Sequence, residues 1–123
     1  MSDGALDGLL ARLSSSDPWE QEQAAEALGA LGDARAVPAL CVALSAPMPA
    51  EPDDLGPEPG HAAVALVTAR FEARDVRLAA ARALGRIGDA RAAGALRARV
   101  ADAREHATVR EAARGALDGL GPR

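Results

Sequence analysis

The chain has 123 residues and a net charge of −4, and this length supports one domain with a modest core. Its residues are 49% hydrophobic but only 2% aromatic, so alanine must fill much of the interior, which favours helices over sheets. No apolar run reaches the roughly 18 residues that a membrane span needs, and the acidic start MSDGALDGLL is unlike a secretory signal. We therefore expect a cytoplasmic domain without a membrane segment. Its only cysteine, Cys41, excludes an intrachain disulfide and a thiolate metal cage.

The charge is divided unevenly along the chain. Residues 1–60 carry eleven acidic and two basic residues, whereas residues 61–123 carry seven acidic residues and twelve arginines. If the chain is laid out in space in sequence order, one end of the molecule is acidic and the other basic. Such a dipole would steer a partner or favour head-to-tail self-association. A solvated surface with a coding bias toward arginine is the alternative explanation.

Two helices are predicted in the first quarter of the chain. DGALDGLLARLSS (3–15) is the first, and the second covers 20–31. The second has a clear start: Asp17 is the predicted N-cap, Pro18 takes the first helical position, and Glu20 reaches back as a capping box.

The pentapeptide GDARA occurs twice, at 32–36 and at 88–92. Its glycine follows the last apolar residue of a helix, where the chain must take a left-handed turn. Its aspartate supplies an acceptor and a negative charge to the start of the next helix, and its arginine can brace that aspartate or the carbonyls of the turn. We interpret GDARA as a corner between two helices. A catalytic role is disfavoured for its charged residues, which are Asp33, Arg35, Asp89 and Arg91.

A partner helix is predicted after each corner. AVPALCVALS (36–45) follows the first corner and ARAAGALRARVADA (90–103) follows the second. Pro38 supports a helix start after the first corner, because proline fits only in the first turn.

The segment between the first partner helix and residue 74 does not fit the pattern around it. APMPAEPDDLGPEPG (46–60) has five prolines and four acidic residues, which predict an extended acidic loop. Loops of this length are often functional, but a neutral linker explains the composition equally well. HAAVALVTARFEA (61–73) fits a helix or a strand, and helix is favoured because a lone strand would have no pairing partner.

Three related segments recur along the chain. The segment 76–88, VRLAAARALGRIG, aligns with VREAARGALDGLG (109–121) at an offset of 33 residues. The segment 20–32, EQEQAAEALGALG, aligns with residues 76–88 at an offset of 56. Asp75 is the predicted helix start of the second copy. In the third copy the predicted helix start is Thr108, with Glu111 three residues later.

Each copy has one apolar face with a spacing near 3.6 residues. No hairpin built on such a helix can bury that face alone, so neighbouring hairpins must stack. We predict an all-α fold of three stacked helical hairpins: 3–32, 33–88 with an insertion at 46–73, and 89–121.

The segments GDARAVPAL and DVRLAAARALGRIGDARA resemble the HEAT repeat, specifically the short HEAT-like type first associated with phycobilisome lyases. The resemblance implies a short right-handed α-solenoid with two layers of antiparallel helices. It also implies that the second helix of each pair lines the concave side, and that such proteins usually hold protein partners. It implies no common chemistry. Gly94, Gly115 and Gly119 depart from the pattern, and we expect the end repeats to be divergent caps.

Few residues have the chemistry of an active site. His61 and His106 are the only histidines and lack metal-ligand spacing. A HEAT-like hydroxylase binds iron through repeated His-Glu pairs, whereas this chain has a single pair in the reversed order. Cys41 is predicted to be a buried thiol beside Leu40 and Leu44. We therefore expect no enzyme activity, no cofactor, no metal and no catalytic residue.

The expected function is that of a non-enzymatic scaffold that binds a protein partner of unknown identity on a concave face of mixed charge. The predicted contact residues are Glu22, Glu26, Arg77, Arg82, Arg86, Arg110 and Arg114.

Three other possibilities stay open. Nucleic-acid binding through the arginine-rich middle repeat is disfavoured, because the first copy carries Glu22 and Glu26 where the second carries Leu78 and Arg82. A HEAT-like lyase or an accessory factor for an enzyme is a second alternative. Homodimerisation through an exposed end of the stack is a third.

Overall fold

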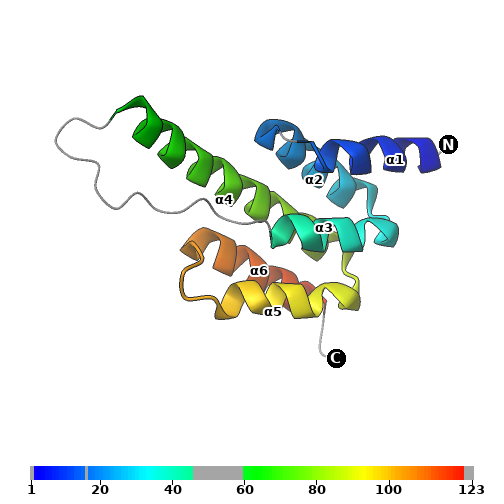
Figure 1. The fold of residues 1–123 in the computed structure, drawn as a ribbon. Coiled ribbons are helices and arrows are strands. Elements are labelled where there is room, and N and C mark those ends of the chain that lie inside the picture. The colour runs from blue at the N-terminus through cyan, green and yellow to red at the C-terminus, as the bar shows by residue number, and fades with distance from the viewer. Residues whose placement is uncertain (1, 16, 46–59, 121–123) are drawn as a thin grey trace.

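The computed structural model describes residues 2–15, 17–45 and 60–120 (Figure 1). Within these ranges the chain forms six α-helices and two short 3₁₀ helices, and no strand. The elements are α1 (Ser2–Leu13), α2 (Pro18–Leu31), η1 (Ala34–Ala36), α3 (Val37–Leu44), α4 (His61–Ile87), η2 (Ala90–Ala92), α5 (Ala93–Ala101) and α6 (Ala107–Gly119).

The helices form two layers (Figure 1). In one layer α4 packs between α2 and α6, and these three helices contain the three repeated segments. The other layer contains α1, α3 and α5, each packed on the helix that follows it in the chain. The predicted all-α solenoid of stacked hairpins is confirmed. We call the layer of repeated segments the α2–α4–α6 layer.

The two GDARA corners have nearly identical geometry, as their sequence predicts. Gly32 and Gly88 end α2 and α4 in the left-handed region, with φ values of 71° and 74°. After each glycine the aspartate Oδ1 accepts a hydrogen bond from the backbone N–H two residues later, at 2.9 Å in both corners. This bond starts the next helical turn.

The arginine of each corner holds the aspartate that precedes it. Arg35 Nη2 lies 2.7 Å from Asp33 Oδ2, and Arg91 Nη2 lies 3.0 Å from Asp89 Oδ2. These side-chain hydrogen bonds, together with the backbone bonds, lower the pKa of both aspartates. Arg91 Nη2 also donates to the Ala34 carbonyl oxygen at 3.1 Å, which joins the second corner to the first. The C-terminal ends of α2 and α4 therefore lie side by side, and the two helices run in the same direction.

The start of α2 differs in one detail from the predicted capping box. Asp17 is the N-cap and accepts from Trp19 N at 3.0 Å, as expected. Glu20, however, accepts from Ser15 Oγ at 2.7 Å, and Ser15 Oγ in turn accepts from Asp17 N at 3.1 Å. The prediction of a direct hydrogen bond between Glu20 and the backbone N–H of Asp17 is therefore wrong, because the Ser15 hydroxyl bridges the two residues.

Two other predicted helix starts are wrong. The segment 61–73 is helical, as favoured, but it continues into the second repeat as one helix, so Asp75 lies inside α4. No proline or glycine interrupts α4 before Gly85, and nothing there ends the first part of the helix. In α6 the N-cap is His106, whose Nδ1 accepts from Thr108 N at 3.1 Å, and not Thr108. The acidic loop predicted at 46–60 lies outside the described residues except for Gly60.

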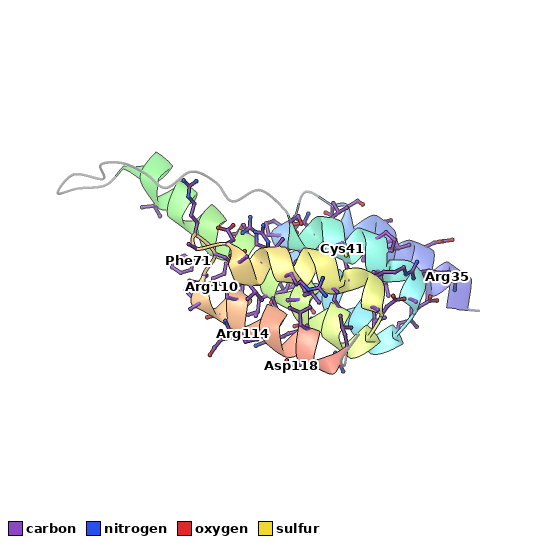
Figure 2. The ribbon with its side chains drawn as sticks, turned by 90° about the horizontal axis from the view of Figure 1, so that it is seen from below. Arg35, Cys41, Phe71, Arg110, Arg114 and Asp118 are labelled. Carbon is purple, nitrogen blue, oxygen red and sulfur yellow. The ribbon has the colours of Figure 1, made fainter. Side chains whose placement is uncertain are left out.

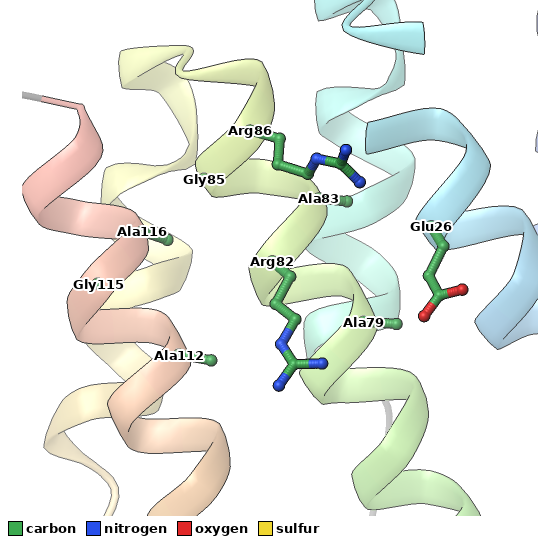
Figure 3. Close-up of a pocket in the computed structure, with 9 residues that line it drawn as sticks. All are labelled: Glu26, Ala79, Arg82, Ala83, Gly85, Arg86, Ala112, Gly115 and Ala116. Carbon is green, nitrogen blue, oxygen red and sulfur yellow. The ribbon is translucent and has the colours of Figure 1, made fainter. Parts of the chain in front are cut away.

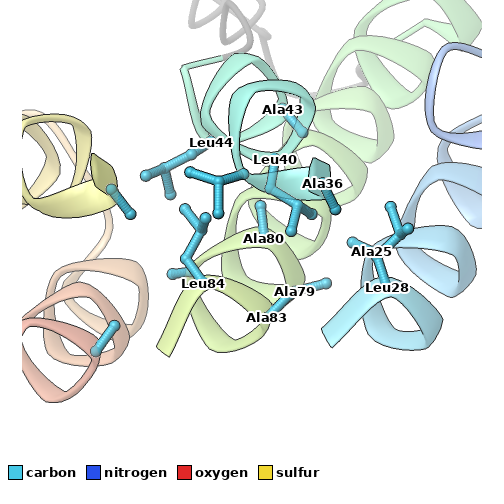
Figure 4. Close-up of a cluster of buried hydrophobic side chains, with 14 of the residues drawn as sticks. Ala25, Leu28, Ala36, Leu40, Ala43, Leu44, Ala79, Ala80, Ala83 and Leu84 are labelled. Atoms are coloured by element: carbon cyan, nitrogen blue, oxygen red, sulfur yellow. The ribbon is translucent and has the colours of Figure 1, made fainter. Parts of the chain in front are cut away.

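Alanine and leucine fill the space between the two layers (Figure 4). The largest fully buried side chains are Leu28, Leu40, Leu44, Leu84, Leu96 and Val109. Their neighbours are mostly alanines with relative exposure of 9% or less, so the low aromatic content is matched by closely spaced helices.

Two glycines set the spacing of the α2–α4–α6 layer. A Cβ placed on Gly29 would lie 2.8 Å from Ala83 Cα, and one placed on Gly85 would lie 3.0 Å from Ala116 Cα. Both distances end on backbone atoms, which cannot move without separating the helices. Gly29 and Gly85 occupy the same position in the first two copies, and the third copy has Asp118 there. Asp118 is exposed on α6, where no described helix follows (Figure 2).

Substitution Gly29→Ala tests this contact. We expect it to lower the free energy of unfolding, because overpacking costs about 1–3 kcal/mol and exceeds the helix-propensity gain of about 0.5–1 kcal/mol. Urea unfolding followed by circular dichroism measures the change. The control is Gly8→Ala in α1, where a Cβ meets nothing within 4 Å and only the stabilising gain is expected. Equal stabilisation of both variants would contradict the close contact.

Candidate interaction surface

A hollow of about 680 Å³ lies on the α2–α4–α6 layer (Figure 3). Its floor consists of small residues from α4 and α6: Ala79, Ala83, Gly85, Ala112, Gly115 and Ala116. Its charged members are Glu26 from α2 and Arg82 and Arg86 from α4. The small side chains that permit close helix packing therefore also leave the surface between the charged side chains shallow and open.

The charges at this hollow change sign from one helix to the next. The acidic residues of α2 are Glu20, Glu22 and Glu26, and the helix has no basic residue. Arg82 and Arg86 lie one turn apart on the adjacent part of α4, and both are exposed. None of the ion pairs found between described residues involves Glu22, Glu26, Arg82 or Arg86. These four charges are available to a partner.

Glu22 belongs to a second, smaller hollow at the N-terminal end of α2. The residues that line it are Asp17, Pro18, Trp19, Glu22, Glu72 and Asp75. Partial burial raises the pKa of the Glu22 carboxyl, and the negative charges of Asp75 and Glu26 raise it further. Trp19 stands beside these carboxylates with 66% of its surface exposed. This edge of the layer is therefore strongly acidic and carries an exposed aromatic ring.

The prediction that Arg77 is presented to a partner is wrong. Arg77 is only 6% exposed, and its Nη1 lies 2.7 Å from Oε2 of Glu105, whose side chain has no exposed surface. Arg99 Nη1 approaches the same oxygen at 3.1 Å, while Glu105 Oε1 accepts from the backbone N–H of His106. Position 77 lies on the side of α4 that meets the loop between α5 and α6. The carboxylate therefore fixes that loop against α4 and α5.

The other predicted contact residues are distributed as follows. Glu26, Arg82 and Arg86 are brought together at the first hollow, and Glu22 lies at the second. Arg114 is exposed on α6 but does not line either hollow, and Arg110 is half-buried (Figure 2).

Arg110 and Arg77 occupy the same position in two repeats, which is a signal that sequence reasoning missed. Both are the arginine of a Val-Arg opening, and each follows a buried valine. Arg77 finds Glu105 in the next interhelical loop. Arg110 lies in α6, after which no further hairpin is described, and its buried Nε has no hydrogen-bond partner among the described residues. The shared opening therefore marks a structural arginine at position 77, and the predicted role of Arg110 stays a prediction.

Cys41 is free and half-buried in α3. Burial raises the pKa of its thiol, with the nearby Arg91 acting in the opposite direction. A raised pKa reduces the thiolate fraction, as expected for a structural cysteine rather than a nucleophile. Among the residues that the structure describes, no group of three or more histidine, cysteine, aspartate or glutamate side chains is arranged to hold a metal ion.

The stacked hairpins and repeated corners define an α-solenoid repeat protein. Residues 20–46 and 76–102 each match the family described as PBS lyase HEAT-like repeat, and these two matches begin at equivalent positions of the aligned copies. Both matches agree with the resemblance to short HEAT-like repeats noted in the sequence. No curated protein matches the chain. No described helix is both long enough and apolar enough to span a membrane.

Substitution Glu105→Gln tests the buried ion pairs. Removing the negative charge abolishes the 2.7 Å ion pair of buried Arg77 and the shorter of the two ion pairs of Arg99, so we expect the free energy of unfolding to fall by about 3 kcal/mol. Urea unfolding measures the loss. The control Glu111→Gln removes the same charge from an exposed position of α6 and should change stability by less than about 0.5 kcal/mol. Similar values for the two variants would show that the Glu105 pairs contribute nothing.

Substitution Glu22→Gln should have the opposite effect. The raised pKa means that the folded chain disfavours the Glu22 carboxylate, so removing the charge should stabilise the fold at pH 7 by about 0.2–0.5 kcal/mol. The gain should vanish below the ordinary pKa of 4.5, because Glu22 is then protonated in both states. Thermal unfolding at pH 7 and about pH 3.5 gives both values. Destabilisation at pH 7 would mean that Glu22 has a stabilising partner.

Proposed function

We propose that this α-solenoid protein is a non-enzymatic scaffold that holds a protein partner on its α2–α4–α6 layer. The observation that carries the proposal is a group of three charges, Glu26, Arg82 and Arg86, around a hollow lined by alanine and glycine, with no ion pair to any of them from the part of the chain that the structure describes. Charged residues that only coat a helix surface tend to find counter-charges three or four residues away. No ion pair between described residues uses these three charges, so a bound partner could supply their counter-charges.

The floor of the hollow supports the same proposal. Alanine and glycine side chains let a partner segment lie close to α4 and α6, where Ala79, Ala83 and Ala112 line the surface. The packed helices hold the charges in place before binding, so little conformational entropy is lost when a partner docks. A complementary partner segment carries acidic groups for Arg82 and Arg86 and a basic group for Glu26.

Nucleic-acid binding is less well supported. A phosphate backbone needs a continuous positive track, and its neutralisation depends on several aligned basic residues. On this layer Glu26 lies at the same hollow as Arg82 and Arg86, and Glu22 and Glu72 line the smaller hollow at the acidic edge, so the positive track is interrupted. A mixed pattern of this kind is complementary to a protein surface.

The proposed role needs no cofactor and no catalytic residue, and we place it in the cytoplasm. An accessory factor for an enzyme would use the same binding surface, with the enzyme as partner. A lyase would need a chromophore groove, and a chain with Trp19 and Phe71 as its only aromatic residues is poorly equipped to form one.

A double charge reversal tests the binding face. We expect Arg82→Glu with Arg86→Glu to reduce partner capture by the tagged protein at least about tenfold, because a docked acidic segment would then meet like charges. The control is Arg97→Glu with Arg104→Glu, which makes the same charge change at two exposed positions of α5 and the following loop. Quantitative mass spectrometry of the captured proteins gives the ratio, and circular dichroism checks the fold. Equal capture by all three proteins would place the binding site elsewhere.

Binding to random duplex DNA tests whether the partner is nucleic acid rather than protein. We expect no retention even at low salt, because the acidic edge repels phosphate. Retention that falls steeply with salt, and that is lost in the Arg82→Glu, Arg86→Glu variant, would favour nucleic acid over protein.

A further inference from the structure

We propose that the N-terminal part of α4 binds the same part of a second copy of this chain, forming a two-fold dimer through a pair of antiparallel helices. We call residues 61–73 of α4 the α4 arm. The proposal rests on the length of α4, on the exposed apolar residues of the arm and on the charges at its two ends. It does not use the hollow of the proposed function, so either proposal can fail without the other.

The α4 arm extends beyond the helices on either side of α4. α4 has 27 residues, whereas α2 has 14 and α6 has 13. The hydrogen bond from Arg91 to the Ala34 carbonyl places the C-terminal ends of α2 and α4 side by side, so the additional residues of α4 lie at its N-terminal end. In the repeat alignment the first residues of α2 and α6 are both equivalent to position 74. The arm therefore projects by about 20 Å from the layer (Figure 1, Figure 2).

The sequence of the arm, HAAVALVTARFEA, is unsuited to a helix that stands alone in water. Nine of its thirteen residues are apolar, and residues 62–67 are apolar without a break. Six consecutive residues cover every side of a helix. Isolated helices of this length are only marginally stable, because protein helices gain most of their stability from packing an apolar face. We therefore expect the arm to be covered by another molecule.

One side of the arm carries exposed apolar groups. Val64 and Phe71 have relative exposures of 56% and 51%, and Thr68 between them is also exposed. Spacings of four and three residues place these three on one side of α4, and Asp75 continues the same line one turn later. Arg74 Cζ lies 4.6 Å from the centroid of the Phe71 ring, so the guanidinium covers only part of the ring. The proposed contact surface is the stripe formed by Val64, Thr68 and Phe71.

The two ends of the arm carry opposite charge. At the N-terminal end the N-cap is Gly60, which provides no side-chain acceptor, so the first N–H groups of α4 present the positive end of the helix dipole. At the other end, Glu72 and Asp75 line the smaller hollow together with Glu22. Burial, and then the charge of Asp75, raises the pKa of the Glu22 carboxyl. Arg74 is one cation beside these carboxylates, with its Nε 3.8 Å from Asp75 Oδ1. A further positive group would therefore stabilise this end.

An antiparallel pair of arms matches both features in a single register. The two-fold axis is perpendicular to the plane that contains the two arms, and it passes between them at the level of positions 67 and 68. Val64 of each copy then faces Phe71 of the other, because both lie about 5 Å from that level on opposite sides. Asp75 of each copy faces Gly60 of the other, because both lie about 11 Å from it. The stacked hairpins of the two copies lie at opposite ends of the pair.

A second copy supplies both halves of this contact by symmetry. A different partner would need apolar groups for Val64 and Phe71 and a positive group for Asp75, all with the same spacing. Two arms of about 20 Å bury less surface than a standard interface of about 1,600 Å², so we expect a weak, reversible dimer. The two-fold arrangement is closed, so association stops at two copies.

Sedimentation velocity of the purified full chain over a range of concentrations tests the proposal. We expect a monomer–dimer equilibrium. Val64→Glu and Phe71→Arg each place a charge against an apolar side chain at two points of the contact, so each should associate at least about tenfold more weakly than the original chain. The control is Val42→Glu on α3, where the valine is 74% exposed and lies outside the arm. A monomer at every concentration would overturn the proposal, and so would equal association of Val64→Glu and Val42→Glu.

Mixing the variants tests the register. In a heterodimer of Val64→Glu with Phe71→Arg, the introduced glutamate faces the introduced arginine, and Phe71 faces Val64 at the other point. We expect this mixture to form a heterodimer that is stronger than either homodimer. The control mixture is Val64→Glu with Val64→Arg, which has the same two opposite charges but places both against Phe71. We expect no heterodimer there, and equal association in the two mixtures would overturn the antiparallel register.

Substitution Asp75→Asn tests the ends of the contact. It removes the negative charge that faces a helix N-terminus at both ends of the dimer, so association should weaken about threefold or more. The control Asp7→Asn makes the same change at an exposed position of α1 and should leave association unchanged. Identical association of the two variants would contradict the register. Thermal unfolding followed by circular dichroism shows whether each variant retains its fold.

Discussion

The close approach of backbones at Gly29–Ala83 and Gly85–Ala116 is the constraint on which the rest of the structure depends. It fixes the separation of α2, α4 and α6, because a Cβ on either glycine would reach a backbone atom of the next helix. The low aromatic content fits the same spacing, since the buried side chains between the helices are alanine, leucine and valine. The shallow floor of the hollow on the α2–α4–α6 layer is the outer side of these contacts.

Because the spacing is fixed, the surface can vary in charge without changing shape. Equivalent positions of the three copies carry Glu26, Arg82 and Gly115, so the same place on the layer is acidic, basic and neutral in turn. Two alanine positions are shared by all three copies: Ala24, Ala80 and Ala113 at one, and Ala27, Ala83 and Ala116 at the other. The helix spacing is therefore a property of the repeat, whereas the charge of the surface depends on residues that differ between the copies.

Local features were predictable from the sequence because they depend on neighbouring residues. The Asp33–Arg35 and Asp89–Arg91 corners follow from residues two positions apart, and the helix at 61–73 follows from its spacing. The buried pair Arg77–Glu105 joins residues 28 positions apart, and no local pattern indicates which carboxylate an arginine inside an apolar face will meet. The same limit explains why Arg77 was assigned to the surface. Glu26, Arg82 and Arg86 were placed together correctly because the repeat alignment itself brings them to one layer.

The uneven charge of the chain becomes a pattern on one surface because a solenoid stacks its hairpins in sequence order. The acidic first third supplies α2, and the arginine-rich middle supplies α4 beside it. A surface that served only solubility would gain from mixing the signs along each helix. Here Glu22 and Glu26 repel one another four residues apart, as do Arg82 and Arg86, and the raised pKa of Glu22 reflects that repulsion in part. Segregated like charges cost stability within one molecule, and a bound molecule of complementary charge would offset that cost, which is the physical basis of the proposed binding face.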